Sequence, residues 1–251
     1  AATDRLLAMG QGVADPDGEE DTGQRSVFMD VYAALAKFHM KSFGTTQAQL
    51  AAVAAKNHAH SAHNPLSQYR EAMTVDEVMA ARKVSWPLTL PMCSPISDGA
   101  AAAILCREEE LDRFDRSRAV KIHATALRTG SDRDPQEFDR HITHLAARDA
   151  YARAGLGPED MHVAEVHDAT AFAEIQQVEN LGFCDFGAGG ALTESGATSI
   201  GGRIPVNLSG GLESKGHPVG ATGLAQVFEL TTQLRGEAGA RQVANAKFAI
   251  A

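Results

Sequence analysis

Apolar residues in the first ninety positions recur at helical spacing. The stretch SVFMDVYAALAKFHMKSFG, residues 26–44, has apolar side chains on one helical face and ends at Gly44. TQAQLAAVAAKNHAHSAH, residues 46–63, predicts a second helix that is capped by Thr45 or Thr46. Little of this part is typical of strands, so we predict a helical subdomain over residues 11–92.

From residue 99 onward, short apolar runs alternate with helical patterns. This alternation indicates a layered α/β domain whose helices cover a mixed, buried sheet. The predicted strands are AAAAILC (100–106), VKIHATAL (120–127), VAEVHD (163–168), IPVNLS (204–209) and QVANAKFAIA (242–251). The predicted helices are EEELDRFD (108–115), DRHITHLAARDAYARAGL (139–156), TAFAEIQQVENLG (170–182) and HPVGATGLAQVFELTTQLRG (217–236).

The glycine-rich stretch NLSGGLESKGHPVGATG surrounds one histidine, His217. It predicts a turn from a strand into a helix, with His217 at the helix entrance and Pro218 in the first turn. Small residues from Gly220 to Gly223 leave room for the thin arm of a ligand. A phosphate-binding loop is excluded, because His-Pro stands where such loops carry Lys-Ser or Lys-Thr.

A second histidine, His167, follows a predicted buried strand within EVHDATAFAE. Ligands bind at the carboxyl ends of strands in open α/β sheets. Since imidazole titrates near neutral pH, His167 and His217 are candidates for a pair that does general acid/base chemistry.

Composition excludes several classes of function. The net charge is −9, and 23 basic residues are scattered among 32 acidic ones, so we predict no nucleic-acid partner. No apolar run suits a membrane span, and the three separated cysteines suggest neither disulfides nor a zinc site. We therefore expect a cytoplasmic protein without a membrane partner. The histidines of NHAHSAH are not expected to bind a metal but to lie on a solvated or coenzyme-facing helix: His58, His60 and His63.

Three motifs together resemble one family. The stretch from Gly201 to Val243, with SGGLESKGHPVGATG at its centre, resembles the C-terminal half of thiolases, especially the sterol-carrier-protein type and its bacterial lipid-transfer relatives. VHDATAFAE resembles the His-Asp-Cys-Phe motif of that branch, and CSPISDGAAAAIL resembles the return from the loop domain to the core. The resemblance covers nearly the whole chain. It implies a layered αβαβα fold with a mixed five-stranded sheet and a mainly helical loop domain, divided here as residues 1–98 and 99–251.

The resemblance also implies roles for individual residues. His217 matches the histidine that deprotonates the nucleophilic cysteine and helps to form an oxyanion hole, and His167 matches a residue of a second oxyanion hole. Ser94 matches a serine that contacts the pantetheine arm of coenzyme A. Within the glycine-rich stretch, the residues predicted to bind the coenzyme are Ser209, Gly210 and Gly220. Coenzyme A would be a co-substrate, and no permanent cofactor or metal is expected.

The implied activity is that of an acyltransferase that cleaves or forms 3-oxoacyl-CoA thioesters in lipid or sterol side-chain metabolism. The family nucleophile has no match among Cys93, Cys106 and Cys184, so the resemblance implies that the N-terminal half is incomplete in this sequence. Two alternatives stay open: a retro-aldolase for 3-hydroxyacyl-CoA that works with an OB-fold partner, and a non-catalytic subunit that binds acyl-CoA. A homodimer or tetramer is expected from the family.

Overall fold

A computed structural model describes residues 2–16, 18, 26–130 and 132–251. Its α-helices are α1 (Ala2–Met9), α2 (Val27–Phe43), α3 (Gln47–Ser61), α4 (Val75–Ala80), α5 (Ile142–Ala154), α6 (Ala171–Asn180), α7 (Gly189–Glu194), α8 (Gly211–Lys215) and α9 (Thr222–Leu234). The strands are β1 (Lys83–Ser85), β2 (Leu88–Thr89), β3 (Val163–Ala164) and β4 (Ala249–Ile250). Short 3-10 helices include η2 (Glu108–Arg113) and η3 (Arg116–Arg118).

Helices α2 and α3 have the ends that the sequence predicts. The glycine after α2, Gly44, has a left-handed backbone with φ 79°, and its N–H donates to the carbonyl of Met40 over 2.8 Å. At the start of α3, Thr46 and Gln49 form a reciprocal capping box with bonds of 3.1 and 3.2 Å. Both predicted helices are therefore confirmed, and their ends are fixed by local hydrogen bonds.

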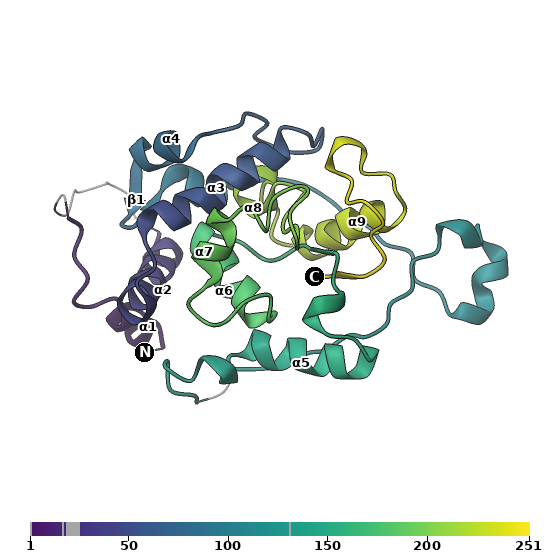
Figure 1. Cartoon of the computed structure of the whole chain (residues 1–251), viewed down its shortest axis with the longest axis horizontal. Helices are drawn as coiled ribbons and strands as arrows, with labels where there is room; N and C mark the ends of the chain where they lie inside the picture. Colours follow the sequence, from purple (N-terminus) through teal and green to yellow (C-terminus); the bar gives the residue numbers. More distant parts are fainter. Residues whose placement is uncertain (1, 17, 19–25, 131) are drawn as a thin grey trace.

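Helix α3 is the central helix of the molecule rather than a surface helix. It crosses α6, α7 and α8 (Figure 1), and alanines such as Ala51 and Ala54, which are fully buried, allow the close approach. His58 and His60 are 5% and 2% exposed. The expectation that the helix is solvated or coenzyme-facing is therefore wrong for His58 and His60, because His58 Nδ1 lies 3.3 Å from Ser214 Oγ of α8 and His60 bonds to the backbone of Asn207 and Ile200.

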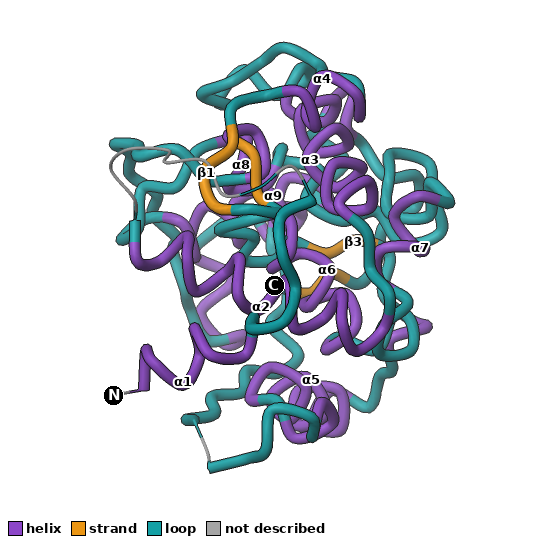
Figure 2. Tube along the Cα trace, turned by 90° about the vertical axis from the view of Figure 1, so that its left-hand side faces the viewer, coloured by secondary structure: helices purple, strands orange, loops and turns teal. Residues whose placement is uncertain are grey.

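The sheet at the centre of the molecule is short and parallel. Strand β3 pairs with β4 on one side, and Ala164 bridges Val206 on the other, so three segments lie side by side. Four backbone hydrogen bonds of 2.9–3.0 Å join them. In Figure 2 the β3 strand lies beside α6, inside the layer of helices. The predicted strands near residues 163, 206 and 249 are confirmed, although each is shorter than the apolar run that predicted it.

The first two predicted strands of the C-terminal part are wrong. Residues 100–106 and 120–127 form no ladder with any described segment, and the helix predicted between them is the 3-10 pair η2 and η3, which projects from the molecule (Figure 1). A strand needs a neighbour for its N–H and C=O groups, and apolar side chains alone do not supply one. In the described part of the chain, three parallel segments lie at the centre of the molecule, and residues 100–106 and 120–127 add no strand to them.

The two predicted parts of the chain both contribute residues to one hydrophobic cluster. Helix α6 contributes Phe172 and Ile175, both at most 1% exposed, to the cluster that is built around α2 and α3. A second cluster joins α5, α6 and the strands, and it includes Ile204 and Val206, both at most 1% exposed. The division at residue 98 stays a prediction from the sequence.

Candidate active site

Residues 93–97 connect the two histidine motifs. Cys93 forms an antiparallel bridge with Thr170, and the N–H of Ser94 donates to the carbonyl of Ala169 over 3.0 Å. A few residues later, Ile96 forms a parallel bridge with His217. Because this extended segment binds both motifs through its backbone, the separation between the two motifs is fixed.

The two predicted histidines lie face to edge. The ring centroids of His167 and His217 are 4.9 Å apart, and the ring planes meet at 87°. His167 lies at the end of the extended chain that follows β3 and is partly exposed, whereas His217 is half-buried. The two histidines are fifty residues apart in the sequence, and the 93–97 segment, which bridges to both motifs, holds them side by side. The structure therefore brings the predicted pair together.

Both imidazoles are neutral at pH 7. Burial lowers the pKa of His217 below the usual 6.5, and the nearby His167 and Lys215 lower this pKa further. The pKa of His167 is lowered by burial first and by Lys215 second. A neutral imidazole has one free nitrogen lone pair, so each ring can accept a proton from a thiol or a water.

The hydrogen bonds of Thr222 define the tautomer of His217. The Thr222 hydroxyl donates to the carbonyl oxygen of Pro218 over 3.1 Å, so its lone pairs are left to accept. His217 Nδ1 lies 2.7 Å from this hydroxyl oxygen and therefore carries the proton that it donates. Nε2 of His217 is then the unprotonated nitrogen, and it is the atom that can act as a base.

The helix that follows His217 starts later than predicted. Helix α9 begins at Thr222, and residues 218–221 form a turn in which the N–H groups of Ala221 and Thr222 donate to the carbonyl of Pro218. The prediction that His217 stands at the helix entrance, with Pro218 in the first turn, is wrong. The side-chain bond to Thr222 connects His217 to the helix instead.

The side chain of Ser97 holds the peptide of His217 in place. The His217 N–H donates to Ser97 Oγ over 3.1 Å, and the Ser97 hydroxyl donates to Gln68 Oε1. Gly216, just before it, has φ 111°, and a Cβ there would lie 2.6 Å from Ser97 Oγ. Glycine at position 216 is thus required both by its backbone conformation and by this close approach.

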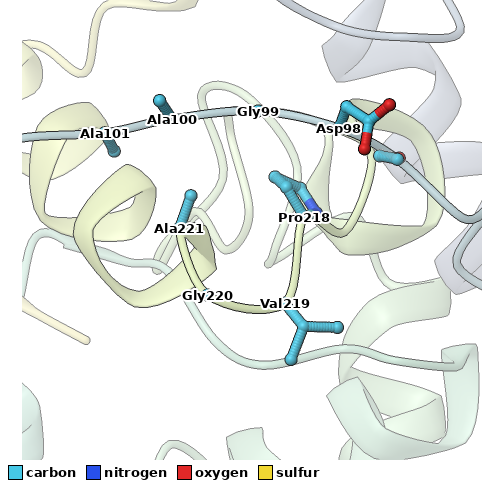
Figure 3. A pocket seen from close by; sticks show the side chains of 9 residues that line it. Asp98, Gly99, Ala100, Ala101, Pro218, Val219, Gly220 and Ala221 are labelled. Atoms are coloured by element: carbon cyan, nitrogen blue, oxygen red, sulfur yellow. The ribbon is translucent and has the colours of Figure 1, made fainter.

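A shallow open pocket lies beside His217. Its volume is about 380 Å³, and it is lined by Ser97, Asp98, Gly99, Ala100, Ala101, Pro218, Val219, Gly220 and Ala221. Figure 3 shows the 98–101 segment running across the turn that follows Pro218. The lining consists mostly of small side chains, and Gly220 is exposed on it, where an added Cβ would meet no atom within 4 Å.

The other predicted coenzyme-binding residues have different surroundings. Ser94 is half-buried beside Ala169, two residues from His167. Ser209 is 1% exposed, and its hydroxyl and N–H both donate to the Glu165 carboxylate, over 2.6 and 2.9 Å. Gly210 is buried against Ser61 of α3. Ser94 and Gly220 thus lie near the imidazole pair or its pocket, whereas Ser209 and Gly210 lie in the interior.

Cys93 and Cys184 are protonated thiols, and the described residues contain no cluster of metal ligands. Burial is the main cause that raises the pKa of Cys93 and of Cys184 to about 12, so both thiols stay protonated at neutral pH. Across residues 2–16, 18, 26–130 and 132–251, no three His, Cys, Asp or Glu side chains gather as a metal site would require. In the same residues, every helix is too short or too polar to cross a bilayer.

Sequence reasoning missed Ser97, Lys215 and Thr222. Each flanks a residue that it had singled out, yet a serine, a lysine or a threonine on its own carries no spacing signal. Only the fold shows that Ser97 bonds to the peptide of His217, that Thr222 bonds to its ring and that Lys215 lies 4.0 Å from Glu165.

Comparison with known proteins places this geometry in a family. A family model described as "Thiolase C-terminal domain-like" matches residues 125–251. Acetyl-CoA acetyltransferase of Methanothermobacter thermautotrophicus is 46% identical over 233 residues, which are 92% of this chain and 61% of that protein. Sterol carrier protein 2 of Rattus norvegicus is 44% identical over 230 residues, 88% of this chain and 42% of that protein.

A solved structure supports the same fold. The complex named Ltp2-ChsH2(DUF35) aldolase matches with a TM-score of 0.71 at 23% identity, over 88% of this chain and 59% of that one. The chain belongs to the thiolase C-terminal domain-like family and has the thiolase-like layered α/β fold. It spans 61% of the first relative's length and 42% of the second's.

Proposed function

We propose that this protein is an acyltransferase of thiolase type, which cleaves or forms 3-oxoacyl-CoA thioesters with coenzyme A as co-substrate. The observation that carries the proposal is the imidazole pair, whose ring centroids are 4.9 Å apart and whose His217 keeps Nε2 unprotonated through Thr222. The relatives include an acetyl-CoA acetyltransferase, which supports the same reaction class.

His217 is proposed as the general base. Its Nε2 accepts the proton of a thiol, and the thiolate sulfur then bonds to the 3-oxo carbon of the substrate. The bond between this carbon and its thioester-side neighbour breaks, and the electron pair moves onto the thioester as an enolate. The thiol proton ends on the new acetyl group, so the products are a shortened acyl thioester and acetyl-CoA.

Negative charge develops on carbonyl oxygens in this reaction, and His167 is proposed to stabilise it. An imidazole N–H of His167, directly or through a water, donates to such an oxygen. Donors that are held in place before the reaction stabilise the transition state more than flexible ones do. The backbone of residues 93–97 holds His167 and His217 in this way.

The open pocket of about 380 Å³ beside Pro218 is proposed to receive the pantetheine arm of coenzyme A. Its small side chains, including Gly220, leave room for a thin chain, and Ser94 lies nearby on the segment that forms one wall. Ser209 and Gly210 are buried, and their predicted contact with the coenzyme is not part of this proposal.

Activity tests the proposal with a matched pair of variants. The protein is incubated with a 3-oxoacyl-CoA and coenzyme A, and acetyl-CoA is measured by chromatography. His217→Ala should lower turnover by roughly two to three orders of magnitude, the scale for losing a positioned base or oxyanion donor. His123→Ala, at an exposed histidine, should not change it. Normal turnover in His217→Ala would exclude His217 as the base.

A retro-aldolase is the second candidate, favoured by the solved neighbour whose name includes an aldolase and a DUF35 partner. That reaction splits a 3-hydroxyacyl-CoA without consuming a thiol, whereas thiolysis consumes one coenzyme A for each cleavage. Product formed from a 3-hydroxyacyl-CoA without free coenzyme A, and only with an OB-fold partner present, would favour the aldolase. Acyl-CoA binding without either reaction would favour a non-catalytic subunit.

Substrate and assembly are proposed on the same basis. Similarity to sterol carrier protein 2 supports bulky or branched lipid acyl chains, so branched and straight 3-oxoacyl-CoA thioesters should be compared. A homodimer or tetramer and a cytoplasmic location remain predictions from the family and the sequence. Light scattering that finds a stable monomer at micromolar concentration would contradict the predicted dimer or tetramer.

A further inference from the structure

Three acidic side chains meet in the interior, where α3 lies against α6 and α8. Asp168, Glu174 and Glu213 are each 0% exposed. An ionised carboxylate loses its hydration on burial, which costs free energy unless hydrogen-bond donors and opposite charges replace the water. The donors that reach the oxygens of these three groups therefore decide which of the groups can be ionised.

All three acidic groups lie around one amide nitrogen, Nδ2 of Asn57 in α3. This nitrogen is 2.9 Å from Glu174 Oε2. It is also 3.2 Å from both Asp168 Oδ2 and Glu213 Oε2. An amide nitrogen carries two N–H groups, so it can direct one at each of two oxygens but not at a third. The site is thus short of donors if all three groups are ionised.

The other donors reach two of the three acidic groups. Glu174 Oε1 accepts from the Lys56 ammonium. Asp168 Oδ1 accepts from the N–H of Leu212 over 2.8 Å. Glu213 Oε1, in contrast, has no hydrogen-bond partner among the described residues. Glu213 is therefore the group that is least suited to carry a negative charge.

Two buried oxygens without a partner belong to the two groups that already bond to each other. Asn57 Nδ2 and Glu213 Oε2 are 3.2 Å apart, whereas Asn57 Oδ1 and Glu213 Oε1 have no partner in the described part of the chain. Unsatisfied buried atoms of this kind need an explanation. A protonated carboxyl group is both a donor and an acceptor, as a primary amide is. One proton on Glu213 Oε1 would satisfy both oxygens, whereas a carboxylate would satisfy neither.

We infer that Glu213 carries a proton at neutral pH and pairs as a carboxylic acid with the Asn57 amide, which makes a pH-sensitive link between α8 and α3. The Asn57 N–H donates to Glu213 Oε2, and the Glu213 O–H donates to Asn57 Oδ1. Loss of the proton would add a negative charge beside Asp168 and Glu174 and would leave two acceptors facing each other. Since α8 leads into the chain that carries His217, the link lies next to the segment of one imidazole.

The titratable and charged groups around Glu213 come from each segment that packs against it. They are Lys56 of α3, Asp168 before α6, Glu174 of α6 and Cys93 of the 93–97 segment. Burial is the main cause that raises the pKa of Glu213 well above 4.5, and the two other carboxyls raise it further, against Asn57 and Lys56. Burial raises the pKa of Asp168 as well, but both of its oxygens accept N–H groups. The proton is therefore assigned to Glu213.

Infrared spectroscopy of the whole protein tests the protonation directly. A carboxylic acid and a carboxylate absorb at different frequencies, and isotopic labelling of the glutamate side chains separates their bands from those of aspartate. At pH 7 the parent protein should show a glutamic-acid band that loses intensity in Glu213→Gln. Glu109→Gln, at an exposed glutamate, is the matched control and should keep the full band. An unchanged band in a folded Glu213→Gln protein would overturn the inference.

The pH dependence of stability measures the same proton independently. Glutamine at position 213 can form both bonds with Asn57, because its amide also donates and accepts. In the parent, the unfolded chain releases the Glu213 proton above pH 4.5 and the folded chain keeps it, so the contribution of Glu213 to stability is fully present below pH 4.5 and falls as pH rises. The folding equilibrium constant of the parent divided by that of Glu213→Gln should fall by about tenfold for each pH unit between pH 5 and pH 7. A ratio that is constant with pH would mean that Glu213 is ionised in the folded protein.

A further variant keeps the test decisive if Glu213→Gln does not fold. Burial also raises the pKa of Glu165, to about 7, so this second buried glutamate contributes to the band. In Glu165→Gln, the glutamic-acid band that remains at pH 7 should come from Glu213, and its absence would overturn the inference. Neither spectroscopy nor unfolding uses enzymatic activity, so the link between α8 and α3 and the proposed thiolase reaction can each fail without the other.

Discussion

Replacing His60 by glutamine should change how the stability of the protein depends on pH. His60 is 2% exposed, and its Nδ1 lies 3.0 Å from the carbonyl oxygen of Asn207. The other nitrogen, Nε2, accepts from the N–H of Ile200 over 3.2 Å. Both bonds need the neutral ring with its proton on Nδ1, because a proton on Nε2 would face the N–H of Ile200.

The size of the effect follows from the pKa of His60. Burial lowers this pKa from 6.5 to about 3, with Lys56 contributing next. As pH falls below 6.5, the unfolded chain takes up a proton at this histidine and the folded chain does not, so stability is lost progressively until pH reaches about 3. Above pH 6.5 the contribution is fully present. Between pH 7 and pH 5 the loss from this one group is about 2 kcal/mol.

The measurement compares pairs of proteins at each pH. The free energy of unfolding of the parent and of His60→Gln is determined by urea titration at pH values between 7 and 5. Glutamine stays neutral, so the free energy of unfolding of the parent minus that of His60→Gln should fall by about 2 kcal/mol from pH 7 to pH 5. Effects of other groups, including Glu165, whose pKa burial raises to about 7, cancel in the difference.

A control and a contrary result complete the test. His63→Gln changes the same residue type at an exposed position just beyond the end of α3. The difference in free energy of unfolding between the parent and this variant should change little with pH. A difference that is constant with pH for His60→Gln would refute the reasoning, because it would mean that His60 takes up its proton equally in the folded and unfolded chain.

Two other predictions concern single side chains. Gly210→Ala should destabilise the protein by roughly 2–5 kcal/mol in urea titration, because φ is 102° and the new Cβ would lie 2.5 Å from Ser61 Cβ. Gly223→Ala is the control, because Gly223 lies in α9 with open space around it, and this variant should stabilise the protein by up to about 1 kcal/mol. Equal effects of the two would contradict the packing argument. Thr222→Val removes the hydroxyl that accepts from His217 Nδ1, so it should lower turnover by roughly tenfold to a hundredfold with little change in KM. An unchanged kcat would show that this bond does not orient the ring.

Local sequence signals determined four of the helices, namely α2, α3, α5 and α6. Gly44, Thr46 and the apolar spacing of α2 and α3 act over a few residues, and the structure has those helices where the sequence predicts them. The same holds for α5 and α6, whose helical patterns lie between the strands. The motifs around His167 and His217 also identified the family, because each motif is contiguous in the chain.

Interactions between distant segments decided the rest. Runs 100–106 and 120–127 have the composition of strands but have no neighbour to pair with in the described structure, so they remain irregular. His58 and His60 of α3 are buried by residues far along the chain, among them Ser214 of α8 beside His58 and the backbone of Ile200 and Asn207 on either side of His60, and no pattern within α3 expresses this. Their burial depends on tertiary packing.

The candidate site divides in the same way. The sequence singled out His167 and His217, but their 4.9 Å separation and the bond from the His217 N–H to Ser97 depend on where segments far apart in the chain meet. A residue type predicts what a side chain can do, whereas its pKa, tautomer and partners are set by neighbours that only the folded chain supplies. Hydrogen bonding and electrostatic interactions act across a few ångströms of space, and distance along the sequence does not measure that space.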